Sequence, residues 1–477
     1  MRSRKSYSRI VVAAVLATLT SLASASAESS SPAADPRAAA ADRMAAQVLS
    51  GKHVPGLAIG IAEHGRIVFA RGYGLADVAK NVPVTADTRF EIGSVTKQIT
   101  AACVLQLVEA GKLSLDARLG SFVSDYFAGR GVTVRQLLEQ VSGVPEFLAG
   151  DDVQVLAGTQ PATYATLVAR VSAKPLEFTP GTRWKYSNTN YILLGRIVEL
   201  AAHESYEHYV RTHIFERAGM TQSGFIADEA TLPAMARGYV PGPKGLAPSP
   251  PLRDDWATSA GAVVSTVGDV LRWDDALLAG KIVSPADVAL MRTTATTVDG
   301  APTHYGFGWI VDTAGTHPRV WHNGGTFGFH AINQTFPADD EAIVVLDNSA
   351  FGLEGFAPAL FAATHPAAAP PVESAAGEVA AVRARVREWL HRFETGDIDR
   401  SQLTAAMTKS LTPDIVDGAK AQLGPLGEPQ SLLYRGVTNE GGSTVYHYRA
   451  TFAQGTFDIT MAVDATGKIG GYLLTPG

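Results

Sequence analysis

A helix that is apolar on nearly every side constrains this chain more than any other segment. Between Ile99 and Ala110, apolar residues recur at four-residue steps (Ile99, Cys103, Leu107), and Ala, Val and Leu fill most of the remaining circumference. A helix with this pattern has to be buried, so we expect it at the centre of the fold. Gly111, directly after the run, is typical of a helix end.

A serine and a lysine stand three positions apart at the start of this run. The spacing predicts Ser94 in the first turn of the helix and Lys97 on the same face, one turn on. A free serine needs a neighbour to take its proton, and a desolvated lysine can lose its charge and do so. The helix N-terminus also offers N–H groups that can hold an oxyanion. The spacing is short, and a helix cap followed by a surface lysine would also produce it.

Two later motifs favour catalysis. Tyr186-Ser187-Asn188 follows a loop at Pro180-Gly181, and His322-Asn323-Gly324-Gly325 follows a strand-like segment. In this order the three motifs resemble those of the serine β-lactamase and penicillin-binding-protein superfamily, within its class C β-lactamase, D,D-peptidase and esterase branch. The resemblance covers about residues 40 to 363 and includes Leu137-Leu138, Ser142–Pro145, Gly219–Thr221, Ser259–Gly261 and Tyr305–Trp309.

The resemblance implies a serine hydrolase that works through an acyl-enzyme, with Ser94 as the nucleophile. Lys97 and Tyr186 would share the proton transfers. A charged Lys97 would lower the pKa of the Tyr186 phenol, whereas a neutral Lys97 could itself be the base, and the sequence leaves both mechanisms open. Asn188 would donate to a substrate carbonyl or hold Lys97.

The motif around His322 would form the substrate-binding side, together with Asn188. Much of the superfamily has Lys at this place, although related peptidases and esterases also accept His. The loss of a permanent charge argues against efficient binding of β-lactam carboxylates. The backbone N–H groups of Ser94 and Gly325 would form the oxyanion hole, since glycine lets a substrate approach closely. The candidate substrate-binding residues are therefore Asn188, His322, Asn323, Gly324 and Gly325.

Strand signals at both ends of the similar region, with helices between them, predict the fold. Residues 37–49 read as a helix, 56–61 and 66–70 as a hairpin, and 114–222 mostly as helices, and strands return at 307–311, 320–322, 330–336 and 342–346. The expected class is α+β: an antiparallel sheet flanked by helices with an all-helical subdomain, which is the β-lactamase/transpeptidase-like fold that the resemblance implies. The active site is expected at the junction.

A small separate α+β domain is expected after residue 377. Residues 364–377 are rich in Pro and Ala and predict a linker. Within residues 378–477, a helical repeat of apolar residues precedes two alternating strands at 446–452 and 457–463. The outline is similar to folds of the nuclear-transport-factor-2 type, and we find no catalytic constellation in it.

The N-terminus predicts export. Residues 1–27 carry a basic start, an apolar core from Ile10 to Leu22 and the cleavage-site pattern Ala25-Ser26-Ala27, all typical of a signal peptide; an uncleaved anchor is the alternative. Residues 28–39 follow as a flexible tether. After cleavage we expect no membrane span, and a bacterial protein that is periplasmic or secreted.

Charge and composition exclude several classes. A formal net charge of −6 does not suit nucleic acid or anionic lipid as a partner. The single cysteine, Cys103, cannot form an internal disulfide and is expected in the core. No zinc, phosphate-loop or Gly-x-Ser-x-Gly motif is found, so we expect no metal and no cofactor. The oligomeric state stays open.

Two functions are compatible with this pattern. One is an exported serine hydrolase acting on an ester or amide: a D-amino-acid peptide, a peptidoglycan fragment, a small ester or, less favoured, a β-lactam. The other is a penicillin-binding or sensor module that becomes acylated without efficient turnover. The sequence contains no dedicated deacylating group that would separate them.

Overall fold

The computed structural model describes residues 35–51, 54–123, 131–147, 164–242, 245–250, 254–314, 316–350, 353, 355–365, 380–440, 443–452 and 455–476. The predicted signal peptide and nearly all of the predicted linker lie outside these residues. Most of the predicted tether, 28–39, lies outside them as well, but its last residues are helical, because α1 (Pro36–Ser50) begins at Pro36. Proline suits a first helical position, where its missing N–H would be unpaired in any case.

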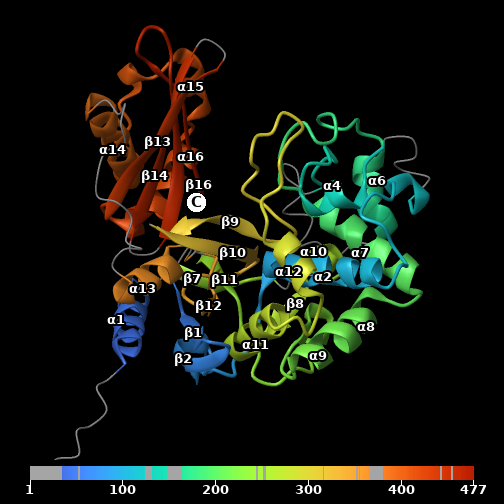
Figure 1. The fold of residues 1–477 in the computed structure, drawn as a ribbon. Coiled ribbons are helices and arrows are strands. Elements are labelled where there is room, and N and C mark those ends of the chain that lie inside the picture. Colours follow the sequence, from blue (N-terminus) through green and yellow to red (C-terminus); the bar gives the residue numbers. More distant parts are fainter. Residues whose placement is uncertain are drawn as a thin grey trace, which may run out of the picture. The chain divides into compact units, whose positions relative to one another are not determined.

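An antiparallel sheet of seven strands forms the centre of the larger part of the chain (Figure 1). Its order is β3-β2-β1-β12-β11-β10-β9, so the first and last strands of this part pair with each other, Leu57 opposite Asp347. The sheet closed by distant segments is thereby confirmed. The strands are β1 (Gly56–Glu63), β2 (Arg66–Asp77), β3 (Val82–Pro83), β9 (Ile310–Ala314), β10 (His317–Thr326), β11 (Phe329–Phe336) and β12 (Glu341–Asp347).

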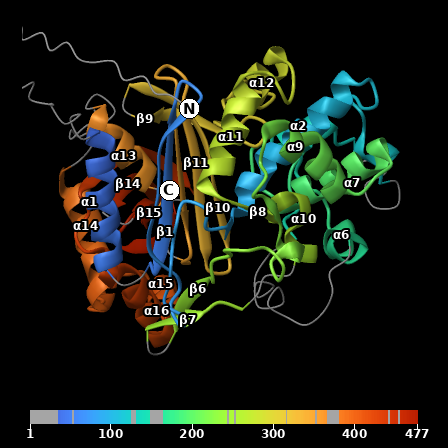
Figure 2. The ribbon, with the colours of Figure 1, turned by 90° about the horizontal axis from the view of Figure 1, so that it is seen from below.

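Helices cover both faces of this sheet. Alternate residues of β1 enter different cores: Leu57 and Ile59 pack with α1 and α13 (Phe356–Thr364), whereas Ala58 joins the core that contains α2 (Thr96–Glu109) and α11 (Val267–Leu278). Figure 2 shows α1 and α13 on one side of the strands and α11 on the other. Because side chains of a strand alternate in direction, β1 is buried on both faces.

The predicted central helix is confirmed as α2. It is buried from Thr96 to Leu107, Cys103 lies in its core, and Gly111 follows its end with a φ of +67°. It packs against α7 and α10. The other helices of this part are α4 (Val134–Leu138), α6 (Tyr164–Ser172), α7 (Asn188–Ala202), α8 (Tyr206–Val210), α9 (Glu216–Ala218), α10 (Asp254–Gly261) and α12 (Pro285–Met291).

Short strands that were not predicted complete this part. Three of them form one small sheet and two form a hairpin: β4 (Phe90–Glu91), β8 (Val263–Ser265) and β5 (Gly224–Phe225); β6 (Tyr239–Gly242) and β7 (Gly245–Pro248). The strand predicted at 307–311 is corrected, since β9 begins only at Ile310. Gly308 has a φ of +77°, and an added Cβ there would lie 2.7 Å from the Lys97 carbonyl oxygen, so this segment is a loop against α2.

The C-terminal residues form a small sheet with helices and a core of their own. The core contains Trp389, Phe393, Tyr448 and Met461. The separate small fold is confirmed, although only part of it was predicted: α15, α16 and β13 were missed. Its elements are α14 (Ala380–Thr395), α15 (Ala405–Ser410), α16 (Pro413–Leu423) and the antiparallel strands β13 (Ser431–Glu440), β14 (Ser443–Phe452), β15 (Gly455–Val463) and β16 (Ile469–Pro476).

The helices of the described residues are short or partly polar in comparison with a membrane-spanning helix. None of them is both long enough and apolar enough to cross a membrane.

Candidate active site

Ser94 lies in a tight turn directly before the central helix. The turn η1 (Gly93–Val95) is a 3-10 helix, and α2 begins at Thr96. The prediction that Ser94 belongs to the first turn of the α-helix is therefore corrected: Ser94 lies in the 3-10 turn that directly precedes this helix. Ser94 is partly exposed while Gly93 and Val95 on either side are buried, so the turn presents one hydroxyl at the surface of a packed region.

Lys97 is fully buried one turn below that hydroxyl. Its Nζ lies 2.8 Å from Ser94 Oγ, 2.8 Å from Asn188 Oδ1 and 2.8 Å from the carbonyl oxygen of Ala260. The Asn188 and Ala260 oxygens can only accept hydrogen bonds, so they take two N–H groups of the amine. The third tetrahedral position of Nζ is thereby directed at Ser94.

Burial lowers the pKa of Lys97 to about 7, and the negative charge of Glu146 opposes this shift. An ammonium loses its hydration in such a site, which favours the neutral amine. At neutral pH both protonation states are therefore populated. In the neutral state the two N–H groups remain on Asn188 and Ala260, and the lone pair points to the Ser94 hydroxyl.

Tyr186 stands on the other side of Ser94. Its ring centroid is 4.9 Å from Lys97 Nζ, and its ring meets that of Tyr305 edge-on at 6.2 Å. Burial of the phenol raises the pKa of Tyr186 well above its usual value, and the hydrogen bond with Ser94 acts in the opposite direction. Tyr186 therefore holds its proton at neutral pH, next to the serine oxygen.

Asn188 is fixed by the start of α7. Its side chain accepts from Lys97, and its backbone N–H donates to Glu146 Oε2 at 2.5 Å. The preceding N–H, of Ser187, donates to Gln140 Oε1 at 3.0 Å. The structure shows the contact with Lys97, which is one of the two predicted roles, and donation to a substrate carbonyl stays a prediction.

His322 is buried on β10, beside the same residues. Its Nε2 lies 3.0 Å from Tyr305 Oη and its Nδ1 lies 2.6 Å from the Asn323 carbonyl oxygen. The carbonyl requires a proton on Nδ1, so Nε2 accepts from Tyr305. Burial, together with the charge of Lys97, lowers the pKa of His322 to about 3. The group is therefore neutral at pH 7.

Two glycines let β10 lie against the serine turn. A Cβ on Gly324 would come within 2.0 Å of the Ile92 carbonyl oxygen, and one on Gly93 within 2.7 Å of the Gly325 nitrogen. Gly325 itself has open space around its Cα. Packing of β10 on the serine turn therefore requires glycine at position 324, and the predicted role of Gly325, close approach of a substrate, stays a prediction. Among the described strands, β9 pairs with β10 only as far as Trp321, so Gly325 has no strand beside it on that side, while β11 pairs with it on the other side, opposite His330.

The structure thus brings together all the predicted residues: Ser94, Lys97, Tyr186, Asn188, His322, Asn323, Gly324 and Gly325. The comparison with known families agrees with this geometry. The family model described as Beta-lactamase matches residues 39–365, more than half of the chain. The chain belongs to the β-lactamase family.

Individual β-lactamase-family relatives are distant. The protein PbpX of Bacillus subtilis (strain 168) is 30% identical over 288 residues, a match that covers 60% of this chain and 68% of PbpX. For the next curated relatives the match spans about 60% of their own length. The chain is therefore similar to these proteins over its family region and not over their full length.

Solved structures show the same fold. An octameric penicillin-binding protein homologue from Pyrococcus abyssi has a TM-score of 0.62 at 24% identity, and the alignment covers 91% of this chain and 96% of the homologue. The D-amino acid amidase from Ochrobactrum anthropi SV3 has a TM-score of 0.59 at 23% identity, covering 65% of this chain and 92% of the amidase. At these identities the likeness shows the fold alone.

Glu146 and Tyr305 contribute to the β-lactamase-type site but were not predicted as site residues. Glu146 directly follows the family-like segment Ser142–Pro145, and Tyr305 opens another such segment, 305–309. The sequence signal that could have identified both residues is an ionisable or hydroxyl-bearing side chain at the edge of such a segment. What brings them to the site is tertiary: Glu146 meets the first turn of α7, and Tyr305 meets β10.

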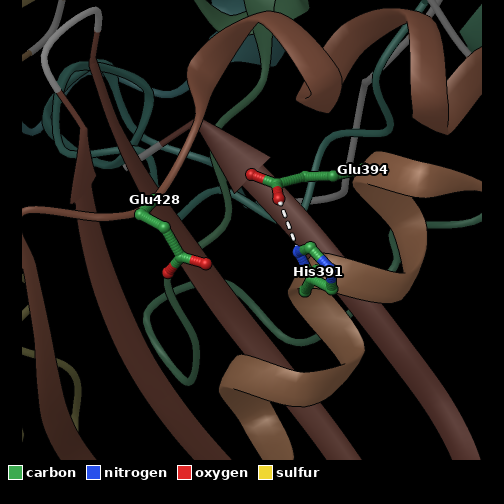
Figure 3. Close-up of side chains that lie close together, drawn as sticks. All are labelled: His391, Glu394 and Glu428. Carbon is green, nitrogen blue, oxygen red and sulfur yellow. Dashed lines mark ion pairs between the residues drawn. The ribbon is translucent and has the colours of Figure 1, made fainter.

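A group of possible metal ligands lies in the C-terminal part (Figure 3). The ligand atoms of His391, Glu394 and Glu428 lie within 4.8 Å of one another, and His391 forms an ion pair of 3.4 Å with Glu394. His391 and Glu428 are exposed. Exposed groups of this kind are common without an ion, so the expectation that the protein needs no metal stays a prediction.

Proposed function

We propose that this chain is an exported serine hydrolase that cleaves ester or amide bonds through an acyl-enzyme on Ser94. The observation that carries the proposal is the contact of 2.8 Å between Lys97 Nζ and Ser94 Oγ, in which two acceptor-only oxygens direct the amine at the hydroxyl. A nucleophile and a base held within hydrogen-bond distance, with the base oriented by other groups, is the arrangement that nucleophilic catalysis needs.

Acylation would begin with neutral Lys97. The lone pair of Nζ takes the Ser94 proton while Oγ attacks the substrate carbonyl carbon. The N–H groups of Ser94 and Gly325 stabilise the oxyanion that forms. As the bond to the leaving group breaks, that group receives a proton from Lys97 by way of the Tyr186 hydroxyl. Water then hydrolyses the acyl-enzyme, which releases the acid and restores the Ser94 hydroxyl.

The site favours a substrate that has no carboxylate for His322 to bind. His322, where much of the superfamily has a lysine, is buried and neutral, and its one N–H already donates to the Asn323 carbonyl oxygen, so it offers no cation to a substrate carboxylate. Small esters and D-amino-acid amides or peptides therefore fit better than β-lactams, whose carboxylate needs a cationic partner. The likeness to a D-amino acid amidase fold supports this choice.

The proposal also assigns a role to each segment of the chain. Residues 1–27 act as a signal peptide, 28–35 as a tether, 40–363 as the hydrolase, and 378–477 as an accessory domain of the nuclear-transport-factor-2 type behind the linker 364–377. The apolar core of the C-terminal part, which is separate from the two cores of the larger part, supports a domain division there. The protein would then act outside the bacterial cytoplasm.

A time-resolved substrate panel tests the proposed reaction. Chromogenic esters, D-amino-acid anilides and a labelled penicillin are each mixed with the full chain, and released product is followed against enzyme concentration. We expect many equivalents of product from at least one ester or D-amino-acid anilide. One equivalent followed by a plateau with every compound would instead support the alternative, a penicillin-binding or sensor module that does not turn over.

A further inference from the structure

A cavity lies on the larger part of the chain, and none of the residues proposed for catalysis lines it. It is formed by α11, by the β1–β2 hairpin and by the β11–β12 hairpin. Its volume is about 350 Å³, and its lining includes Asp274, Leu278, Arg292, Thr335 and Phe336. Pockets that hold small molecules begin at roughly this size.

Most charged groups at this cavity already have partners of opposite charge. Asp275 lies 3.1 Å from Lys281 Nζ, and Asp340 lies 2.8 Å from His64 Nδ1. Asp274 and Arg292 differ from these. Within the described part of the chain, neither of them has an oppositely charged atom within 4.0 Å. Burial raises the pKa of Asp274 and lowers that of Arg292, and the charge of each residue partly opposes the shift of the other, so the two charges interact without direct contact.

One oxygen atom of the Asp274 carboxylate has no hydrogen-bond donor among the described residues. The residue is 2% exposed, and its Oδ1 accepts from Asn333 Nδ2 at 2.9 Å. Its Oδ2 is buried and has no hydrogen-bond partner among the residues that the structure describes. Burial raises the pKa of Asp274 to about 7. A buried polar atom without a partner is costly, so this oxygen marks a place where a ligand donor would be stabilising.

Arg292 offers the complementary charge on the same wall. Its Nη2 donates to Thr335 Oγ1 at 2.9 Å, and the charge of Asp274 acts on the guanidinium without direct contact. A guanidinium has five N–H groups and binds a carboxylate in a fixed, two-bond geometry. Between and around the two charges the lining is apolar, with Ala62, Leu271 and Pro337 beside Leu278 and Phe336.

We infer that this cavity binds a small zwitterion, an α-amino acid with an apolar side chain, whose ammonium meets Asp274 Oδ2 and whose carboxylate meets Arg292. Such a ligand carries its two charges on one carbon, which suits an acid and a base that line one cavity without direct contact. Its side chain would lie on the apolar lining. The inference concerns a site apart from Ser94 and does not depend on the proposed hydrolysis.

The cavity is connected to the helix of Lys97 by buried hydrogen bonds. Asn333 Nδ2, which donates to Asp274, also donates to Gln98 Oε1 at 3.0 Å, and Trp273 Nε1 donates to the same oxygen at 3.1 Å. Gln98 follows Lys97 directly in α2. An ammonium that holds Asp274 in its charged form would therefore strengthen the hydrogen bond at one end of a path that leads to α2.

Calorimetric titration of the full chain with L-leucine and with D-leucine tests the inference. We expect saturable, one-to-one binding of at least one enantiomer, and binding at least tenfold weaker for both N-acetylleucine and leucinamide, since each lacks one of the charges. Ser94→Ala is expected to bind as the wild type does, because Ser94 lies outside the cavity. Binding that disappears in Ser94→Ala would place the ligand in the catalytic site and overturn the inference.

Three variants locate the bound amino acid. Asp274→Asn and Arg292→Gln are each expected to weaken leucine binding at least tenfold. Asp275→Asn, which lines the same cavity but removes a carboxylate that Lys281 already neutralises, is the matched control and is expected to bind normally. Folding is checked by circular dichroism, and if Asp274→Asn does not fold, Arg292→Gln carries the test alone. Equal binding by the Arg292→Gln and Asp275→Asn variants, or no binding of either enantiomer at 10 mM (about 2.7 kcal/mol of binding free energy), would refute the site.

Discussion

At the scale of single residues, burial separates the protonation states of the two proposed proton carriers. It lowers the pKa of Lys97 to about 7 and raises that of Tyr186. The amine can therefore be neutral where the phenol is protonated, which favours Lys97 as the base among the two mechanisms that the sequence left open. The bonds of Lys97 to Asn188 and Ala260 keep its third position on Ser94.

The pH dependence of kcat/KM follows from this assignment. The base must be unprotonated, so activity should fall as the pH drops below about 7, roughly tenfold per unit, and level off above it. His322 is neutral throughout this range, so His322→Gln should lower activity without changing the pH below which activity falls. The measurement is kcat/KM on a chromogenic ester between pH 5 and 9. If the fall of activity at low pH shifts or disappears in His322→Gln, the titrating group is His322 and not Lys97.

Lys97 and Tyr186 should behave as one unit. Lys97→Ala and Tyr186→Phe are each expected to lower kcat/KM by about 10³-fold. Because both residues serve one proton path to and from Ser94, the double variant should lose little more than either single one. The three values are compared as free energies from steady-state rates. Losses that add would indicate independent roles.

At the scale of elements, the site depends on how closely β10 approaches η1. The Cβ of an alanine at position 324 would come within 2.0 Å of the Ile92 carbonyl oxygen, which is backbone and cannot move aside as a side chain would. At position 325 the same methyl group meets open space. The contact between the strand and the turn is therefore fixed by one glycine of the pair.

Alanine at each of the two positions tests this contact. Gly324→Ala should lower the free energy of unfolding by about 1–3 kcal/mol and abolish most activity, because β10 has to move away from Ser94. Gly325→Ala keeps its N–H and should stay as stable as the wild type, with a smaller loss of activity. Denaturant unfolding and ester hydrolysis are measured for both. If Gly325→Ala were less stable than Gly324→Ala, β10 would not contact η1 through Gly324 as described.

The sequence predicted the elements whose patterns are local. The all-round apolar helix became α2, and the strand-like segments 56–61, 330–336 and 342–346 became β1, β11 and β12, as the alternating segments 446–452 and 457–463 became β14 and β15. Pairing of β1 with β12 was expected only because strand signals stood at both ends of the region. Short strands such as β4 and β8, two or three residues long, carry too few residues for a period, and β13 and α16 in the C-terminal part were missed as well.

Within the site, the sequence motifs identified the residues, whereas their protonation states depend on tertiary packing. The motifs placed Ser94, Lys97 and Tyr186 together, but the pKa of Lys97 depends on complete burial. Glu146 acts through a contact with the first turn of α7, 42 residues further on. No local pattern reports such a contact, which is why Glu146 was not predicted.

At the scale of the whole molecule, the hydrophobic cores divide the chain. Two cores lie on the two faces of the seven-stranded sheet, and a third belongs to the C-terminal sheet and its helices. All residues proposed for catalysis come from the part with the first two cores. The family match ends at residue 365, at the end of that part.

A shortened chain ending at His365 tests this division. It should fold cooperatively and hydrolyse a small ester with kcat/KM close to that of the full chain, because a small ester contacts only the Ser94 region. Activity on a larger peptide substrate is the matched comparison, since the C-terminal part can contribute contacts there. An insoluble fragment, or a soluble one inactive on small esters, would show that the two parts function only together.

The acyl-enzyme itself is the most direct test of the central claim. The full chain is mixed with a slowly hydrolysed chromogenic ester, quenched in acid within milliseconds to seconds, and digested for mass spectrometry. We predict a burst of one equivalent of the coloured product, an acyl mass on the peptide that contains Ser94, and its disappearance at the rate of steady-state turnover. Ser94→Ala should show neither burst nor adduct. Turnover by Ser94→Ala, or an acyl group on any other residue, would contradict the account.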